Sequence, residues 1–349
     1  MRCNVGPLLL VSSIAIFTAA CSYSNAQAAD VPLDPIMGEF EGTFTPAGGQ
    51  AVKAEAKVLA DQDHNYRVAI LYPAGEAKAT RIEFAGKGAD GVVSLTGADW
   101  NGKKFKDNWT GKVTKDTLNV VGVGQHGGTA EMKRVVRTSP TLGQKPPKGA
   151  VVLLPFEEGK PTNLDLWANK TWHILPDGTV QVGQGDNKSV RDFASFKAHV
   201  EFCVPFAPAA RGQGRGNSGV YLHGRYEIQV LDSFGLAASS YSQGYNPPGS
   251  GECAAIYDQR APLVNSSLPP GVWQTYDIEF QAPKFDASGK QTHGALITVS
   301  HNGVKILDAV ETKNVTGGAW GQPGKTGPLR LQDHNNPTKF RNIWVVELP

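Results

Sequence analysis

Strong charge and long apolar runs are both scarce in this sequence. Only 19% of the 349 residues are charged, and the formal net charge is +2, with neither a basic stripe nor an acidic tail. This balance argues against nucleic acid or an anionic membrane as the partner. After the first 28 residues, no segment is apolar and long enough to cross a bilayer, so we predict no transmembrane segment.

Long amphipathic runs of helical period are also missing. Glycine (40 residues) and proline (23 residues) are plentiful instead. This composition is typical of short strands joined by many turns. A chain of 349 residues is long enough for two domains, each with its own core. We therefore predict an all-β protein of two domains.

The N-terminus has the features of a secretory signal. Arg2 precedes an apolar stretch from Leu8 to Ala20, and Ala26-Gln27-Ala28 is a small-x-small cleavage pattern. We predict that residues 1–28 are a signal peptide and that the mature protein is extracytoplasmic, either periplasmic or secreted. Ala19-Ala20-Cys21 also resembles a lipoprotein signal, so a lipid anchor at Cys21 is the minor alternative.

Cysteine is rare, with four residues in the whole chain. Removal of residues 1–28 would leave Cys203 and Cys253. Two thiols in an oxidising compartment could pair. They could equally be two buried thiols, and the sequence leaves both alternatives open.

Residues 36–137 are predicted to form a small, separate β-domain. Tyr66, Val68, Ile70 and Tyr72 alternate with polar residues, as on a half-buried strand, and Gly-rich turns separate several such segments. No cluster of acid, base and nucleophile stands out, so the role of this domain is left unassigned. Residues 138–149, rich in proline and glycine, are predicted to be a linker.

Residues 150–349 also have the strand pattern throughout. Residues 198–204, 276–280 and 340–346 alternate apolar and polar side chains, and Asn302-Gly303 suits a type I′ hairpin turn. Many strands at short spacing, without helical periods between them, predict an antiparallel sandwich or jelly roll.

The segment 217–233 contains the densest set of chemically useful residues. We interpret it as two strands that turn at Gly224, with a side-chain period of two. That period places five polar or aromatic residues on one face: Tyr221, His223, Arg225, Glu227 and Gln229. Aromatic faces and planar polar groups are what sugar recognition requires. The alternative is a solvated sheet face on which Arg225 and Glu227 form a surface ion pair.

Five motifs in this half closely resemble the 3-keto-disaccharide hydrolase family. They are Asn217-Ser218-Gly219-Val220-Tyr221, the run from Arg225 to Ser233, Gly251 to Tyr257, Trp273 to Ile278, and Leu331-Gln332-Asp333-His334 with Phe340 to Trp344. The resemblance covers residues 150–349 and none of the N-terminal half. It implies a fold similar to the concanavalin A-like lectins and glucanases, a jelly-roll sandwich with sugar on its concave face. Asn335 stands where the family usually has Gly, and Cys203 where Arg is common.

The resemblance also implies cleavage of a glycosidic bond in a sugar already oxidised at C3. A base would remove the C2 proton, the C1 substituent would leave, and water would add to the double bond. Glu227, His223 and Asp232 are the candidate catalytic residues, although strand parity keeps Asp232 off the Glu227 face unless the strand ends or bulges first. The candidate substrate-binding residues are Tyr221, Arg225, Gln229, Glu201, Gln332 and His334, with Arg225 or a bound cation stabilising the enolate. Glu201 and His334 are further candidates for proton transfer, and Arg330 could extend the polar face beside Gln332.

No metal site is predicted, because the adjacent Asp333 and His334 are weak evidence for one. Gly212 to Gly216 lacks the Lys-Ser/Thr of a phosphate loop and is predicted to be a flexible loop. A non-catalytic carbohydrate-binding protein is the main alternative function. A retaining glucanase ranks third, because Gln229 and Leu231 interrupt the Glu-x-Asp-x-Glu pattern that such enzymes use. The sugar, its linkage, any cofactor and the oligomeric state are left open.

Overall fold

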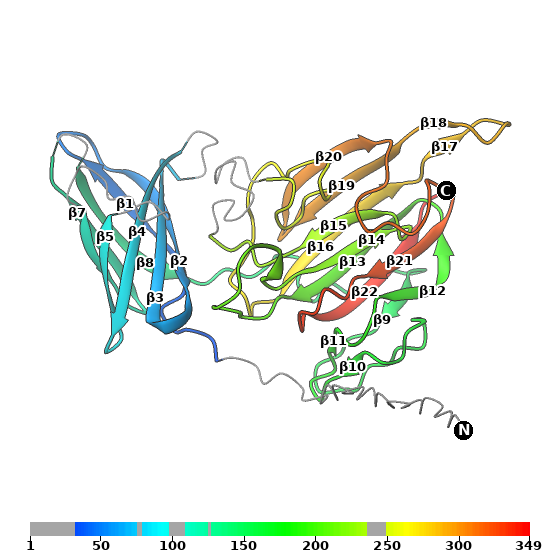
Figure 1. Ribbon diagram of the computed structural model, residues 1–349, viewed down its shortest axis with the longest axis horizontal. Helices are drawn as coiled ribbons and strands as arrows, with labels where there is room; N and C mark the ends of the chain where they lie inside the picture. Colours follow the sequence, from blue (N-terminus) through cyan, green and yellow to red (C-terminus); the bar gives the residue numbers. More distant parts are fainter. Residues whose placement is uncertain (1–31, 75–78, 98–108, 125–126, 236–248) are drawn as a thin grey trace, which may run out of the picture.

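The computed structural model describes residues 32–349, except 75–78, 98–108, 125–126 and 236–248 (Figure 1). The described residues are strands and loops with two short 3₁₀ turns, η1 (Gln62–His64) and η2 (Gly212–Gly214), which confirms the all-β prediction. Among these residues, no helix has the length and apolar character needed to cross a membrane. The predicted signal peptide, including Cys21, lies outside the described residues.

The first part of the chain is a closed barrel in which each strand pairs with its neighbours in antiparallel fashion. Its strands are β1 (Gly38–Pro46), β2 (Val52–Ala60), β3 (Asn65–Tyr72), β4 (Thr80–Ala89), β5 (Val92–Gly97), β6 (Thr110–Val113), β7 (Thr117–Gly122) and β8 (Gly128–Val135). Alternate residues point inward, and Phe40, Phe44 and Phe84 fill the interior. Pairing of β1 with β8 leaves no open edge in this sheet.

The second part consists of two antiparallel sheets (Figure 1). The larger sheet has the order β10-β11-β22-β13-β16-β19-β20, with β9 beside β22; the smaller has the order β12-β21-β14-β15. The larger sheet contains β9 (Val151–Leu154), β10 (His173–Ile174), β11 (Val180–Gln181), β13 (Phe196–Cys203), β16 (Gln274–Gln281), β19 (Ala295–His301), β20 (Val304–Thr312) and β22 (Lys339–Glu347). The smaller contains β12 (Asn187–Phe193), β14 (Ser218–Leu222), β15 (Tyr226–Val230) and β21 (Gly327–Leu331), while β17 (Lys284–Phe285) and β18 (Gln291–His293) form a separate ribbon.

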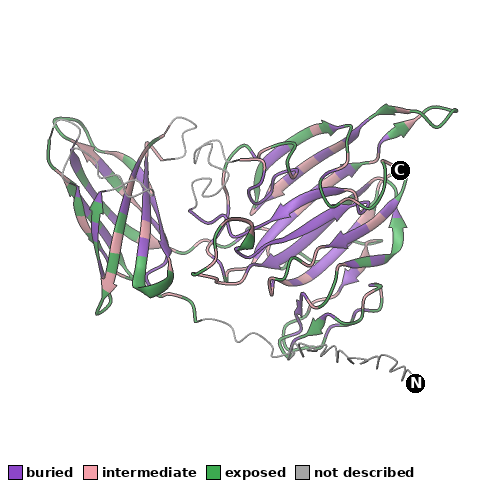
Figure 2. Cartoon of the chain, viewed as in Figure 1, coloured by how far each residue is buried: buried purple, intermediate pink, exposed green. Residues whose placement is uncertain are grey.

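The two sheets enclose one apolar core. Val200 and Phe202 of the larger sheet and Val220, Leu222 and Ile228 of the smaller sheet belong to the same buried cluster. The strands that supply them are buried along most of their length (Figure 2). The predicted sandwich is therefore confirmed.

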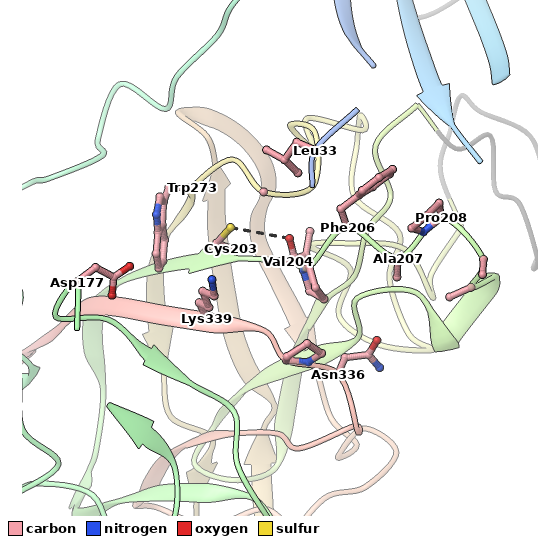
Figure 3. A pocket seen from close by; sticks show the side chains of 15 residues that line it. Leu33, Asp177, Cys203, Val204, Phe206, Ala207, Pro208, Trp273, Asn336 and Lys339 are labelled. Atoms are coloured by element: carbon pink, nitrogen blue, oxygen red, sulfur yellow. Dashed lines mark hydrogen bonds between the residues drawn. The ribbon is translucent and has the colours of Figure 1, made fainter. Parts of the chain in front are cut away.

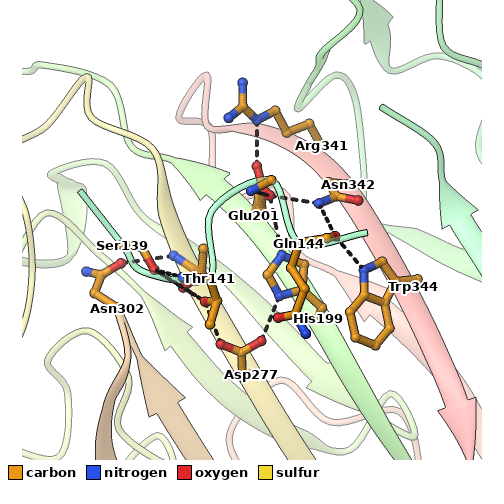
Figure 4. Close-up of polar contacts among 12 residues, drawn as sticks. Ser139, Thr141, Gln144, His199, Glu201, Asp277, Asn302, Arg341, Asn342 and Trp344 are labelled. Carbon is orange, nitrogen blue, oxygen red and sulfur yellow. Dashed lines mark hydrogen bonds and ion pairs between the residues drawn. The ribbon is translucent and has the colours of Figure 1, made fainter. Parts of the chain in front are cut away.

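The segment 139–144, which belongs to the predicted linker, crosses the outer face of the larger sheet (Figure 4). Ser139 Oγ lies 2.6 Å from Thr275 Oγ1, and the backbone N–H of Gly143 donates to Glu201 Oε1 at 2.6 Å. The carbonyl of Gln144 accepts a hydrogen bond from Asn342. We call residues 139–144 the strap, because they are tied to three strands of this sheet.

The barrel and the sandwich are in direct contact. Phe234, which follows β15, is 1% exposed and belongs to the core cluster of the barrel, and Phe206 packs against the same cluster. Lys57 of β2 lies over the Phe234 ring, 5.4 Å from its centroid, and donates a hydrogen bond to the Ser267 carbonyl. The sandwich thus packs an aromatic side chain against the outer wall of the barrel, because Lys57 lies on the face of β2 opposite to the inward Ala56 and Val58.

Candidate active site

The outward face of the smaller sheet carries a compact set of polar side chains. Tyr221 of β14 pairs with Glu227 of β15 on one side and with Arg330 of β21 on the other, and Gly219 pairs with Gln229. Although this face points away from the apolar core, Tyr221, Glu227, Gln229 and Arg330 are at most 3% exposed. The face is therefore a covered polar site and differs from the solvated sheet face that was the alternative.

Glu227 lies at the centre of this set, and a glycine opposite makes room for it. Glu227 Oε2 is 2.8 Å from the hydroxyl of Tyr221. The carboxyl lies across the backbone of Gly219, where a Cβ atom would come within 2.3 Å of Glu227 Oε1. The glycine of the Asn-Ser-Gly-Val-Tyr motif is thus explained by this close approach, since any side chain would displace the carboxyl.

The surroundings of Glu227 favour its neutral form. Burial raises the pKa of Glu227 to about 7, although the Tyr221 hydrogen bond and the positive charge of Arg330 act in the opposite direction. The nearby carboxylates of Asp186 and Asp258 add to the increase. A carboxyl group with a pKa near neutrality exchanges protons readily in both directions, as a general acid–base catalyst must.

The hydroxyl of Tyr221 has one hydrogen but two acceptors within reach. It lies 2.8 Å from Glu227 Oε2 and 3.0 Å from the carbonyl of Gly317, and it receives a hydrogen bond from Gln332 Nε2 at 3.2 Å. When Glu227 is protonated, it can donate to Tyr221, and Tyr221 can donate to Gly317. When Glu227 is ionised, Tyr221 must turn its hydrogen to the carboxylate. The pair can therefore hold either protonation state without breaking up the site.

Arg330 brings a buried positive charge beside this pair. Its guanidinium lies 3.5 Å from the centroid of the Tyr221 ring and 4.4 Å from that of Trp320. Nη2 donates to the Gly318 carbonyl, and Nε is 3.5 Å from Asp186 Oδ2. Nη1 is buried and has no hydrogen-bond partner among the described residues. A stacked guanidinium with an unused donor suits an anionic oxygen of a ligand.

Three amide side chains extend the site beside Glu227. Gln213 Oε1, on the turn η2, accepts hydrogen bonds from Asn217 Nδ2 at 2.9 Å and from Gln229 Nε2 at 2.8 Å. The other amide oxygens, Asn217 Oδ1 and Gln229 Oε1, are buried without a partner in the described part of the chain, as is Gln332 Oε1. Buried acceptors of this kind suit ligand hydroxyl groups, because sugars carry many donors.

His223 and Arg225 do not share the Glu227 face, contrary to the sequence interpretation. Both follow β14 in the turn, where His223 has a φ of 55° and the strand alternation is lost. The His223 ring packs against Phe196 and Phe280, with Nε2 2.8 Å from the Ala194 carbonyl, and burial lowers its pKa. Arg225 is half-buried and donates to the carbonyl of Thr326.

Asp232 and Glu201 are also engaged elsewhere. Asp232 lies beyond the end of β15 and forms a buried ion pair with Arg215 at 2.6 Å. Glu201 lies on the outer face of the larger sheet, beneath the strap, where Arg341 Nε donates to it at 2.7 Å (Figure 4). His334 is exposed in the loop after β21. Of the nine predicted site residues, the structure therefore groups Tyr221, Glu227, Gln229 and Gln332.

Sequence reasoning missed two contributors to this group. Gln213 lies in the segment that was predicted to be a flexible loop, and its side chain joins the site because η2 folds back over β15. Asp186 precedes β12, and its carboxylate faces Arg330. The spacing of glycines around Gln213 was the available signal, since Gly212 and Gly216 both have positive φ and shape a tight turn.

Cys203 and Cys253 are buried thiols and form no disulfide in the described part of the chain. Cys253 Sγ lies in the core, 3.1 Å from the hydroxyl of Tyr276. Cys203 lines a cavity of about 550 Å³ at the end of β13, together with Trp273 and Leu33 (Figure 3). None of the residues grouped around Glu227 lines this cavity. Within the described ranges, no three His, Cys, Asp or Glu side chains are grouped so as to hold a metal ion.

Fold and site together define a two-sheet β-sandwich with a buried carboxyl group of raised pKa on its smaller sheet. The family model described as the 3-keto-alpha-glucoside-1,2-lyase-like domain matches residues 149–346, which is more than half of the chain. The chain therefore belongs to this family, and the resemblance drawn from the sequence motifs is confirmed.

Two solved structures from Parabacteroides distasonis are similar to this chain, and both carry the provisional description of a glycosyl hydrolase. The first is 33% identical, with a TM-score of 0.49, and the match covers 58% of this chain and 84% of that one. The second is 18% identical, with a TM-score of 0.37, and the match covers 55% and 91% respectively. No curated protein matches the chain.

Proposed function

We propose that this protein is an exported enzyme that cleaves 3-keto-glycosides by removal of the C2 proton, elimination of the C1 substituent and hydration of the product. The observation that carries the proposal is the buried Glu227, whose pKa is raised to about 7. Membership of the 3-keto-alpha-glucoside-1,2-lyase-like family and the sugar-compatible polar face support it. Export rests on the signal features of residues 1–28.

The chemistry assigns the base to Glu227. A ketone at C3 acidifies the C2–H bond, so the ionised carboxylate takes that proton and the electron pair forms an enolate. The enolate then expels the oxygen at C1, and the protonated Glu227 gives its proton to that oxygen, which leaves as an alcohol. Elimination therefore consumes no net acid. In the hydration, Glu227 takes a proton from water as the hydroxyl adds to C1 and gives that proton to C2, so it is ionised again for the next cycle.

Arg330 takes the part of enolate stabiliser in this proposal, in place of Arg225. Its guanidinium stacks on the Tyr221 ring beside Glu227 and has a buried Nη1 without a partner among the described residues, whereas Arg225 lies in the turn after β14, off the Glu227 face. A fixed cation in a buried site stabilises a developing oxyanion more than an exposed one does, because water does not screen it. Tyr221 keeps Glu227 in position in both protonation states.

The deciding experiment measures turnover of a 3-keto-disaccharide by the purified protein. We expect release of a reducing sugar, a slower reaction when C2 carries deuterium, and no detectable turnover in Glu227→Gln. Glu201→Gln is the matched control, because Glu201 is a buried glutamate on the other sheet. Binding of the sugar without any product would instead assign the chain as a carbohydrate-binding protein. Equal turnover by wild type and Glu227→Gln would remove Glu227 from the mechanism.

A further inference from the structure

We infer that Asp61 of the barrel is a positioning residue for the active site, acting through the turn that carries Gln213. This inference rests on the proposed function, since it gives the barrel a part in binding the same substrate. It starts from the ion pairs that cross from the barrel to the sandwich at η2. Arg211 and Arg215 stand at the two ends of this turn, and both contact Asp61.

The barrel holds Asp61 in a fixed position. Arg67 Nε of β3 lies 2.8 Å from Asp61 Oδ2, and Arg67 Nη2 donates to Oδ1 at 3.2 Å. This two-point contact fixes the plane of the carboxylate, and the side chain is only 9% exposed. Asp61 Oδ1 is left facing the sandwich, 3.3 Å from Arg211 Nη2 and 3.6 Å from Arg215 Nη1.

On the sandwich side, Arg215 is held by a second ion pair, with Asp232. Arg215 is 1% exposed, and its Nε lies 2.6 Å from Asp232 Oδ2. The backbone N–H of Asp232 donates to the Arg215 carbonyl at 3.1 Å, which fastens the turn to the chain leaving β15. Arg215 thus joins Asp61 of the barrel to Asp232 of the sandwich, and loss of either carboxylate would leave this buried guanidinium with one anionic partner instead of two.

Gln213 lies between these two arginines and points its amide into the site. Its Oε1 accepts from Asn217 and Gln229, and its Nε2 donates to the Gly251 carbonyl at 2.9 Å. Asn217 and Gln229 each keep a buried oxygen that has no partner among the described residues. The position of the turn therefore decides where these two acceptors point, and the turn is fixed from the barrel by Asp61.

The test compares Asp61→Asn, Asp61→Glu and a matched control, Asp116→Asn, with wild type. Asp116 is a barrel aspartate between β6 and β7, and both members of its ion pair with Lys115 are exposed. We expect Asp61→Asn to raise KM for the 3-keto-disaccharide by about three- to tenfold, because one or two neutral hydrogen bonds from the substrate to Asn217 and Gln229 would be weakened. The value of kcat should stay within about twofold of wild type. Asp61→Glu should recover part of the lost affinity, and Asp116→Asn should leave both constants unchanged.

A double variant shows whether Asp61 acts through Gln213. If it does, Asp61→Asn combined with Gln213→Ala should raise KM no further than Gln213→Ala alone, since coupled residues are not additive. An unchanged KM in Asp61→Asn would overturn the inference, as would fully additive effects in the double variant. Absence of turnover in the wild type would contradict the proposed function itself. Failure of the present inference differs from this, because the wild type would then be active and only the expected effect of Asp61→Asn would be missing.

Discussion

Each sheet of the sandwich carries one buried glutamate on its outward face, and the chemistry of these two residues is opposite. Glu227 on the smaller sheet is 3% exposed, and Glu201 on the larger sheet is 0% exposed. Burial raises the pKa of Glu227 to about 7. Burial alone would also raise the pKa of Glu201, but hydrogen bonds from His199, Asn342, Arg341 and the Gly143 backbone lower it to about 2.

The difference lies in the number of donors that each carboxylate receives. Among the residues that the structure describes, Glu201 has four, whereas Glu227 has the single hydroxyl of Tyr221 and a nearby guanidinium that stacks on the tyrosine ring. A carboxylate that receives several hydrogen bonds stays ionised and serves as an anchor, here for the strap (Figure 4). One with few donors and little solvent keeps a proton near neutral pH and can exchange it. Burial by itself therefore does not identify a catalytic carboxyl.

The largest expected difference between the roles of the two glutamates is in catalysis. Glu227→Gln should lower kcat for a 3-keto-glycoside by about a thousandfold or more, the usual scale for loss of a general base. The melting temperature should stay close to that of wild type or rise, because an amide resembles the protonated carboxyl that the site favours. Steady-state kinetics and calorimetry on the same preparation give both values. A large fall in melting temperature would make Glu227 a structural residue like Glu201.

Glu201→Gln should show the reverse pattern. Loss of the buried charge removes the anionic partner of Arg341 and leaves His199 with Asp277 alone, so we expect the free energy of unfolding to fall by about 3 kcal/mol. Turnover should be nearly unchanged, because Glu201 lies on the other sheet. Denaturant unfolding followed by tryptophan fluorescence measures the change. A loss of activity without loss of stability would contradict the assignment of Glu201 as an anchor.

Tyr221→Phe sharpens the comparison by removing the one hydroxyl donor of Glu227. Because the Tyr221 hydrogen bond lowers the pKa of Glu227, its loss should raise that pKa further and leave less carboxylate at neutral pH. We expect turnover at pH 7 to fall by about three- to tenfold and to recover toward higher pH. The rate of Tyr221→Phe measured from pH 6 to 9 tests this. A uniform loss at every pH would mean that the hydroxyl acts on the substrate instead.

The smallest expected effects concern how the free energy of unfolding changes with pH, where Glu227 and Glu201 should act in opposite directions. In the folded state the pKa of Glu227 lies above its ordinary value of 4.5, so between about pH 4.5 and about pH 7 the folded state holds a proton that the unfolded state has lost. The contribution of Glu227 to the free energy of unfolding therefore falls as pH rises through this range. For Glu201 the folded pKa is about 2, so its contribution is complete above about 4.5 and is lost as pH falls toward 2. The stability advantage of Glu227→Gln over wild type should therefore grow between pH 4.5 and 7. The deficit of Glu201→Gln should shrink between pH 4.5 and 2, and slopes of equal sign would contradict the comparison.

Strand alternation predicted part of this site and no more. It places Tyr221, Glu227 and Gln229 on one face, where the structure has them, because all three lie within regular strands. It fails for His223 and Arg225, because both belong to the turn and His223 has a positive φ. The period of two applies only while the ladder continues, and the sequence does not show at which residue the ladder ends.

Glu201 and Gln213 illustrate two other limits. Glu201 has the parity of an outward residue, as predicted, but parity within one strand does not reveal which sheet the strand joins. Gln213 reaches the site because Arg211 and Arg215 are paired with Asp61, about 150 residues earlier in the chain. The all-β class and the family, in contrast, could be predicted from local periodicity and contiguous motifs, since neither depends on distant contacts.

The protonation state of Glu227 in the intact protein can be measured directly by infrared titration of its carboxyl group. The carboxylic C=O stretching band should be present in wild type at pH 6, disappear with a midpoint near pH 7, and be absent from Glu227→Gln at the same frequency. Glu201→Gln should retain this band. Burial also raises the pKa of Glu252, which contributes equally to both proteins, so the comparison of wild type with Glu227→Gln isolates the band of Glu227. A wild-type spectrum identical to that of Glu227→Gln in this band above pH 5 would show that Glu227 is ionised like Glu201, and would contradict its part as the proton-transfer group.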